Sequence, residues 1–249
     1  MTQYAPLAAV HTLSAGTAAA RPVVLIHGFA SSGAEDFTAT GWAADLAAAG
    51  HHVTVVDLPG HGDGPAVANP AEAQTARVVA QLAAVVDRVL ADTGAATADV
   101  IGYSLGARLA WELPAAAPGR VGRLVLGGIS PMEPFAMVDT DELRAVVVGA
   151  SEPTNPLVGM MAQMVGASGR DTGSLINLIG GLAAEPFAPA GNAPAVPTLF
   201  VAGADDMMTG GIEELAALVP VASLTRVPGD HRGALDSPEL RKAAIDFLA

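Results

Sequence analysis

Short apolar runs alternate with longer stretches of helical periodicity along most of the 249-residue chain. Each short run is apolar at nearly every position, which is typical of a strand buried on both faces of a sheet. Gly, Pro or Asp follows most of these runs and marks the turn that ends the strand. We predict strands at residues 23–26, 53–56, 100–101, 124–126, 199–201 and 223–227.

The stretches between these runs have the spacing of amphipathic helices. In residues 71–90, for example, Val78, Leu82, Val85 and Val89 recur with a period close to 3.6 residues, and charged residues occupy the other side. Alternating strands and helices predict an α/β fold with a doubly wound, mostly parallel sheet. The predicted helices are residues 42–49, 71–90, 105–117, 212–218 and 239–248.

Residues 131–189 break this alternation because they contain no convincing strand. They hold three short helical candidates, at 141–148, 156–165 and 174–184. We therefore predict a core in two parts, residues 1–130 and 190–249, with a helical cap formed by 131–189 over the carboxyl edge of the sheet. The cap is rich in methionine, which suits an adaptable apolar pocket but equally suits the interior of a helical layer. The methionines considered for such a pocket are Met132, Met160, Met161 and Met164.

Composition excludes several classes of function. The net charge is −13 with no cluster of Lys and Arg, so nucleic acid is not an expected partner. The absence of cysteine excludes disulfides, thiolate metal sites and a cysteine nucleophile. We expect neither a metal nor an organic cofactor. The start of the chain does not resemble a secretory signal, and the longest uncharged stretch, 186–204, holds four prolines. We expect a cytoplasmic protein without a membrane span, and either a monomer or a dimer is compatible with the sequence.

The segment GYSLG places Ser104 between a predicted strand and a predicted helix. A turn this sharp strains the backbone of its central residue, and Gly102 and Gly106 lack the Cβ atoms that would otherwise clash. The serine oxygen then lies at the positive end of a helix dipole, where a nucleophile is useful. The alternative is an ordinary serine that caps the helix.

A serine nucleophile needs a base, an acid and donors for the oxyanion. His231, in GDHRGAL, is the one histidine that follows Ser104 in the chain, and it comes after the last predicted strand. Asp205 and Asp206 follow the strand at 199–201, and either can orient the histidine. The loop after His27 and the amide of Leu105 are candidate oxyanion donors; His27 itself is interpreted as structural.

Taken in order, these segments resemble the α/β-hydrolase superfamily: VVLIHGF, VVDLPGHGDG, VIGYSLGA, LVLGGISP, FVAGADD and PGDHRGAL, over residues 21–249. The resemblance implies a triad of Ser104, Asp206 and His231, oxyanion donors at Phe29 and Leu105, and a cap at 131–189. The sequence departs from the family pattern in three places. Only about one hairpin fits before Arg21, Gly106-Ala107 stands where Gly-Gly is common, and Asp63-Gly64 follows DLPGHG.

The fold hosts many reactions, so the resemblance does not fix the substrate. A serine nucleophile excludes the members that attack with aspartate. We predict hydrolysis of small-molecule carboxylic esters with small or medium apolar acyl groups. One alternative is a lyase, because the segment GYSLGARLA resembles the menaquinone-pathway synthase. Such an enzyme would use Arg108 beside an anionic substrate. C–C bond hydrolysis, thioester hydrolysis and a ligand-binding receptor on the same fold are the others.

Overall fold

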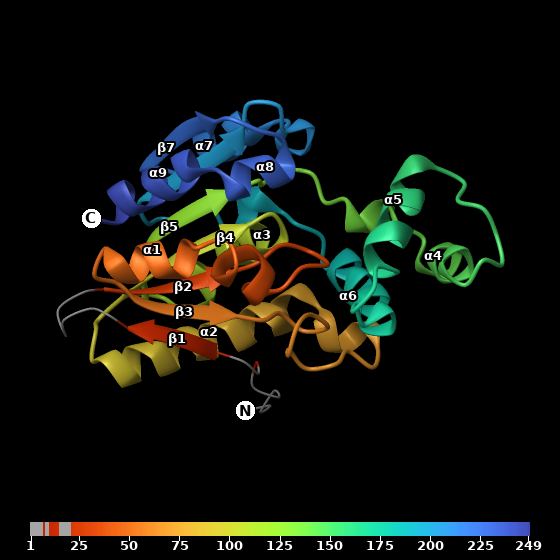
Figure 1. Cartoon of the computed structure of the whole chain (residues 1–249), viewed down its shortest axis with the longest axis horizontal. Helices are drawn as coiled ribbons and strands as arrows, with labels where there is room; N and C mark the ends of the chain where they lie inside the picture. The colour runs from red at the N-terminus through yellow and green to blue at the C-terminus, as the bar shows by residue number, and fades with distance from the viewer. Residues whose placement is uncertain (1–6, 8–9, 15–20) are drawn as a thin grey trace.

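The computed structural model describes residue 7, residues 10–14 and residues 21–249. Within them, one seven-stranded sheet has the order β1-β3-β2-β4-β5-β6-β7 (Figure 1). Strand β1 is antiparallel to β3, and all other neighbours are parallel, which confirms the predicted fold class. The strands are β1 (Val10–Ser14), β2 (Pro22–Ile26), β3 (His52–Val56), β4 (Ala98–Tyr103), β5 (Val121–Gly127), β6 (Thr198–Gly203) and β7 (Ala222–Val227).

Among the described residues before Arg21, the structure has one strand, β1. Strand β1 pairs with β3, so it does not fold back on β2, which follows it in the sequence. The expectation of one hairpin before Arg21 falls largely on residues 1–6, 8–9 and 15–20, which lie outside the described residues.

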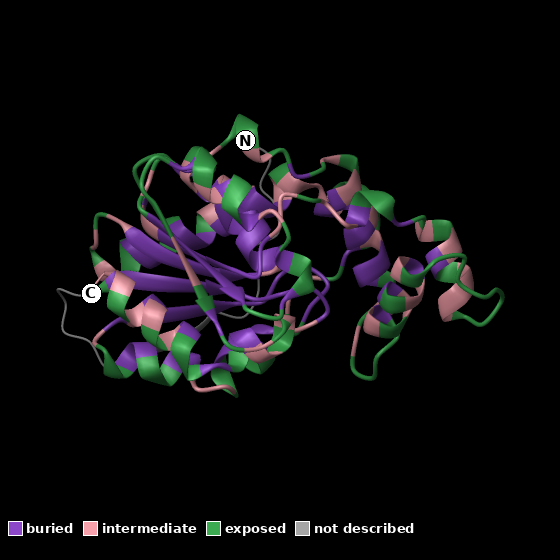
Figure 2. Cartoon of the chain, turned by 90° about the horizontal axis from the view of Figure 1, so that it is seen from above, coloured by how far each residue is buried: buried purple, intermediate pink, exposed green. Residues whose placement is uncertain are grey.

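Two hydrophobic cores flank the sheet, and successive strand residues alternate between them. In β2, Val23 and Leu25 face one core, whereas Val24 and Ile26 face the other. This period of two on a sheet covered on both faces explains why the strands read as continuous apolar runs. The strands are accordingly buried in Figure 2, and the covering helices turn their exposed residues outward.

In the part of the chain that the structure describes, six α-helices outside the 131–189 insertion contribute to these two cores. One core takes side chains from α1 (Trp42–Ala48), α8 (His231–Asp236) and α9 (Pro238–Leu248), and the other from α2 (Thr75–Thr93), α3 (Leu105–Ala116) and α7 (Ile212–Leu218). Among the described residues, no helix combines the length and apolarity needed to cross a bilayer.

The helix predicted at 71–90 is two elements. A 3₁₀ turn, η2 (Pro70–Ala73), is followed by Gln74 with extended backbone angles, and α2 begins only at Thr75. The interruption separates the short turn that contacts the cap from the long helix that packs on the sheet. Helix α2 then runs past the predicted end to Thr93, because Gly94 takes the left-handed conformation that ends it.

The segment 131–189 contains the three predicted helices, α4 (Thr140–Val147), α5 (Pro156–Val165) and α6 (Thr172–Ala184). Side chains of Asp139, Asn155 and Asp171 accept main-chain hydrogen bonds at their first turns. Helix α6 is fixed to the body, since Ser174 and Asn177 bond both polar groups of the Val67 main chain at 2.8 Å. Figures 1 and 2 show α4 and α5 beyond α6, farther from the sheet.

Candidate active site

Ser104 forms the entire turn between β4, which ends at Tyr103, and α3, which begins at Leu105. Its backbone angles are φ 53° and ψ −116°, a region that residues other than glycine rarely occupy. Its side chain makes no capping hydrogen bond to the helix, so the alternative of an ordinary N-cap is excluded. Because the Ser104 backbone is strained and its side chain does not cap the helix, its hydroxyl is available for chemistry.

The two flanking glycines are required by close contacts of the backbone. A Cβ atom at Gly106 would lie 1.9 Å from the main-chain oxygen of Ile26, and one at Gly102 would lie 2.4 Å from the main-chain oxygen of Gly106. No real side chain tolerates such distances. The G-x-S-x-G spacing therefore follows from packing α3 tightly against β2 and β4.

Asp206 and His231 form a hydrogen-bonded pair at the carboxyl ends of β6 and β7. The Nδ1 atom of His231 lies 2.8 Å from Asp206 Oδ2, and the Asp206 side chain is fully buried. The other carboxylate oxygen accepts the amide of Met208 at 2.9 Å, so Asp206 both caps a 3₁₀ turn and orients the ring. Asp205 is exposed, and Asp230 instead caps α8 through the Gly233 amide.

His231 is the first residue of the short helix α8, which follows β7. The hydroxyl of Tyr103 donates to the main-chain oxygen of His231 at 2.5 Å, and the two rings are 5.4 Å apart. A Cβ atom at Gly128 would lie 2.9 Å from His231 Cε1. The imidazole therefore lies over the ends of β4 and β5, beside the residue that precedes Ser104. Its side chain is 27% exposed, so substrate can reach it.

Two buried histidines support the loop after β2. Nδ1 of His27 bonds the Gly28 oxygen at 2.7 Å, and its Nε2 accepts the Leu58 amide at 3.0 Å. Nδ1 of His61 bonds the Pro59 oxygen at 2.9 Å, and its Nε2 accepts the Ala30 amide at 2.9 Å. Burial lowers the pKa of His27 and lowers that of His61 well below 6.5. Both rings are therefore neutral, which lets one nitrogen donate and the other accept.

The amide of Phe29 lies between two amides that are already bonded. Gly28 donates to Asp36 at 2.9 Å and Ala30 donates to His61, whereas no hydrogen bond among the described residues uses the Phe29 amide. Leu105 is the first residue of α3, and first-turn amides of a helix have no partner within it. Both amides are thus without a hydrogen-bond partner among the described residues, and that of Leu105 directly follows Ser104 in the chain.

A family model described as the alpha/beta hydrolase fold matches residues 21–150, just over half of the chain. The chain belongs to the alpha/beta hydrolase family.

Solved structures agree with this family. Similar folds include a hydrolase from Pseudomonas aeruginosa PA01 (23% identity, TM-score 0.68, covering 96% of this chain and 94% of that chain). The enol-lactonase from Burkholderia xenovorans LB400 has 21% identity and a TM-score of 0.72, covering 98% of this chain and 99% of that one. MenH from S. aureus has 19% identity and a TM-score of 0.72, covering 96% and 97%. At these identities the likeness extends to the fold and not to the reaction.

Arg108 of this alpha/beta hydrolase is not positioned as a free anion-binding group. It is buried and forms an ion pair with Glu133, with the two side chains 6% and 5% exposed. Its Nη2 also donates to Thr75 Oγ1 and to the main-chain oxygen of Glu185, each at 3.0 Å. The charge is already balanced by Glu133 at the start of the insertion. A role for Arg108 in a substrate pocket stays a prediction. Sequence reasoning missed Glu133 because nothing local links it to Arg108.

The four methionines do not share one environment. Met161 is buried in the core and Met164 packs against it, whereas Met132 and Met160 are exposed. Met161 and Met164 thus belong to a hydrophobic core, and a substrate pocket lined by the four methionines stays a prediction. The ring of Phe29 packs on Phe135, with ring centres 5.1 Å apart, which supplies an apolar contact between the cap and the loop after β2.

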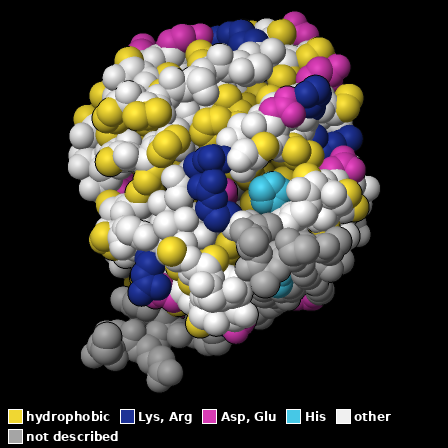
Figure 3. Space-filling view, turned by 90° about the vertical axis from the view of Figure 1, so that its left-hand side faces the viewer, with side chains coloured by type: hydrophobic (Ala, Val, Ile, Leu, Met, Phe, Trp, Pro, Cys, Tyr) yellow, Lys and Arg dark blue, Asp and Glu magenta, His cyan; other side chains and the backbone are white. Residues whose placement is uncertain are grey.

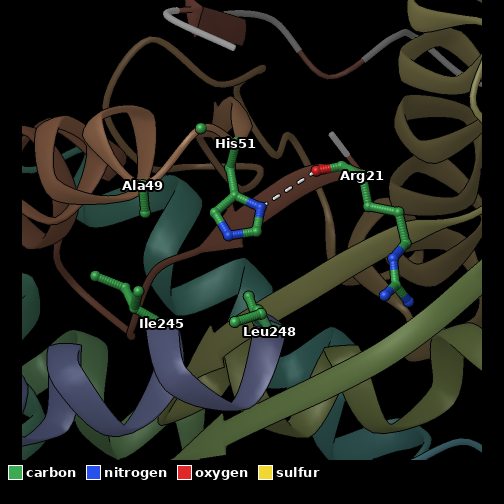
Figure 4. Close-up of a pocket in the computed structure, with 7 residues that line it drawn as sticks. Arg21, Ala49, His51, Ile245 and Leu248 are labelled. Carbon is green, nitrogen blue, oxygen red and sulfur yellow. Dashed lines mark hydrogen bonds between the residues drawn. The ribbon is translucent and has the colours of Figure 1, made fainter. Parts of the chain in front are cut away.

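Two cavities lie away from Ser104. One of about 270 Å³ lies at the amino ends of the strands, where His51 bonds the main-chain oxygen of Arg21 at 3.3 Å beside Ile245 and Leu248 (Figure 4). On the molecular face in Figure 3, at that end, basic side chains are separated and several lie beside acidic ones. The other cavity, of about 480 Å³, is bordered by α2, α3 and the chain after α6. Neither is lined by Ser104, Asp206 or His231.

Proposed function

We propose that the protein is a serine hydrolase that cleaves carboxylic esters with small or medium apolar acyl groups. Ser104 is the nucleophile, His231 the general base and Asp206 the acid that orients it. The observation that carries the proposal is the strained, uncapped Ser104 on the turn directly after Tyr103, whose ring centre lies 5.4 Å from an imidazole whose Nδ1 is held by a buried carboxylate. Because Nδ1 is engaged, Nε2 is the nitrogen that takes up a proton.

In the proposed reaction, Ser104 Oγ attacks the ester carbonyl carbon while His231 Nε2 accepts the hydroxyl proton. The imidazolium is stabilised by Asp206, which keeps its negative charge. Collapse of the tetrahedral intermediate breaks the bond to the alcohol, which leaves with the proton from His231. Water then attacks the acyl-serine and gives a proton to His231. Collapse of this second intermediate breaks the bond to Ser104 Oγ, which takes the proton back from His231, and the acid product leaves.

The negative charge of each tetrahedral intermediate is held by the amides of Phe29 and Leu105. Preorganised backbone donors of this kind contribute about 3 kcal/mol each to transition-state stabilisation. The neutral state of His61 supports this role, because a protonated ring could not accept the Ala30 amide that fixes the loop beside Phe29. The dipole of α3 adds to the favourable field at Ser104.

The preference for apolar acyl groups rests on the side chains beside the donors. Phe29 packs against Phe135, and both rings are largely buried. The competing lyase function needs a cationic partner for an anionic substrate, and the residue that suggested it, Arg108, is paired with Glu133. We therefore favour the ester over the polycarboxylate.

The test is turnover of p-nitrophenyl acetate and butyrate by the whole chain. The proposal predicts turnover of both, loss of activity in Ser104→Ala, and unchanged activity in Ser151→Ala, an exposed serine between α4 and α5. An acyl thioester and a vinylogous 1,5-diketone are assayed in parallel as probes of thioesterase and C–C hydrolase activity. Tight ligand binding without turnover of any probe would identify a receptor and refute the enzyme.

A further inference from the structure

Asp36 is a buried carboxylate with no role in the mechanism proposed above. It lies in η1 (Ala34–Thr38), a π-helical turn between β2 and α1, and its side chain is 2% exposed. Single π-helical turns are rare and are frequently found at functional sites. A carboxylate buried to this extent keeps its charge only when donors surround it. Its donors therefore identify what the carboxylate holds together.

The donors come from two separate parts of the active site. Asp36 Oδ2 accepts the amide of Gly28 at 2.9 Å, and Oδ1 accepts the hydroxyl of Ser31 at 2.6 Å. These two residues lie on either side of Phe29, the first proposed oxyanion donor. Oδ1 also accepts Nη1 of Arg232 at 2.6 Å, across 196 positions of sequence.

Arg232 is the residue directly after His231, so the same carboxylate is linked to the loop of the oxyanion donor and to the helix that begins with the base. Gly28 lies close to both Ser104 and Asp36. A Cβ atom at Gly28 would lie 3.5 Å from the Cβ of Ser104 and 3.6 Å from Asp36 Oδ2. A shift of the carboxylate therefore changes the spacing between nucleophile, donor and base together.

We infer that Asp36 and Arg232 are positioning residues, forming a clasp that fixes the distance between the Phe29 amide and the His231 ring. The inference rests on the proposed function and adds to it the two residues that set the spacing between the oxyanion donor and the base. Neither residue touches the reacting atoms. Their loss leaves substrate binding largely intact and lowers the rate of the chemical step, because misplacing a catalytic group by about 1 Å costs up to roughly 100-fold.

The experiment compares Asp36→Asn, Arg232→Gln and the double variant on the ester that the wild type hydrolyses. We expect kcat to fall about 10- to 100-fold in each single variant, with KM changed less than about threefold. Because both substitutions open one clasp, the double variant is expected to be no slower than the slower single variant. Arg232 is 52% exposed and Asp36 keeps the Gly28 and Ser31 donors, so Arg232→Gln is expected to fold, and kcat is measured well below the unfolding midpoint of each variant.

The matched control is Arg241→Gln. Arg241 also links a C-terminal helix to the chain after η1, through Asp45 at 3.1 Å and the Thr40 oxygen at 2.5 Å, without contacting Asp36. Its kcat is expected to equal that of the wild type. An inactive wild type overturns the proposed function and the inference with it. An active wild type with an unaffected kcat in Arg232→Gln, or with purely multiplicative losses in the double variant, overturns the inference alone.

Discussion

Replacing Arg108 by alanine tests whether this arginine anchors the cap or serves a substrate. The side chain joins α3 to both ends of the 131–189 insertion, through Glu133 at its start and the main-chain oxygen of Glu185 near its end. Removing it leaves the Glu133 carboxylate buried with two main-chain donors, Phe135 at 3.2 Å and Phe187 at 3.4 Å.

The expected loss follows from the burial of the pair. Removing one partner of a buried ion pair costs about 3–5 kcal/mol, because the other charge stays buried without compensation. Two long main-chain contacts remain on the carboxylate, so we expect the lower end of that range, about 3 kcal/mol. An exposed pair is worth far less, typically under about 1 kcal/mol.

Urea unfolding at neutral pH, followed by tryptophan fluorescence, measures this loss. Trp111 is buried on the same helix and its ring packs on Phe187, 5.6 Å away, so it reports on the region that Arg108 anchors. The control is Arg120→Ala, whose half-exposed pair with Asp87 spans 3.2 Å. If Arg108→Ala lost no more stability than Arg120→Ala, the anchoring role would be wrong and the arginine would again be a candidate ligand for a substrate anion.

Three further predictions use matched positions. Asp206→Asn should lower kcat about 10⁴-fold because the ring loses its orienting charge, whereas Asp205→Asn should keep kcat; equal effects in an ester assay would contradict the assignment. Gly106→Ala should prevent folding, since its Cβ would lie 1.9 Å from a main-chain oxygen. Gly159→Ala, in α5, places its Cβ at van der Waals distance from its neighbours and should raise the free energy of unfolding by roughly 0.5–1 kcal/mol. Circular dichroism and urea titration distinguish the two outcomes. Burial lowers the pKa of His61 well below 6.5, so the unfolded chain binds a proton that the folded chain excludes. Stability should be complete above about pH 6.5 and fall as pH drops, by up to about 1.4 kcal/mol per unit for this group. His61→Gln should flatten that slope between pH 6.5 and 5, and an unchanged slope would contradict the neutral assignment.

The parts of the fold that were predictable are those set by short-range pattern. Apolar runs such as residues 23–26 read as strands because both faces of the sheet are covered, and the spacing of Gly102, Ser104 and Gly106 reads as a turn because close backbone contacts demand it. Asp206 was chosen over Asp205 only through the family resemblance. Its burial, which makes it suitable, comes from tertiary packing.

The parts that could not be predicted depend on contacts between distant segments. Nothing near Arg108 indicates that Glu133 neutralises it, and nothing near Asp36 indicates that Arg232 reaches it. The methionines were equally ambiguous, because an apolar helical side chain gives the same sequence signal whether it lines a pocket or fills a core. The break at Gln74 could not be predicted either, because one polar residue with non-helical backbone angles leaves the periodicity of the apolar positions nearly unchanged.

The most direct measurement of the central claim is the site of covalent modification by a fluorophosphonate. The account predicts one phosphonyl group per chain, located by peptide mass spectrometry on Ser104, with labelling abolished in Ser104→Ala and strongly slowed in a His231→Ala variant. Labelling at another residue, or none on the folded wild-type chain, would contradict it.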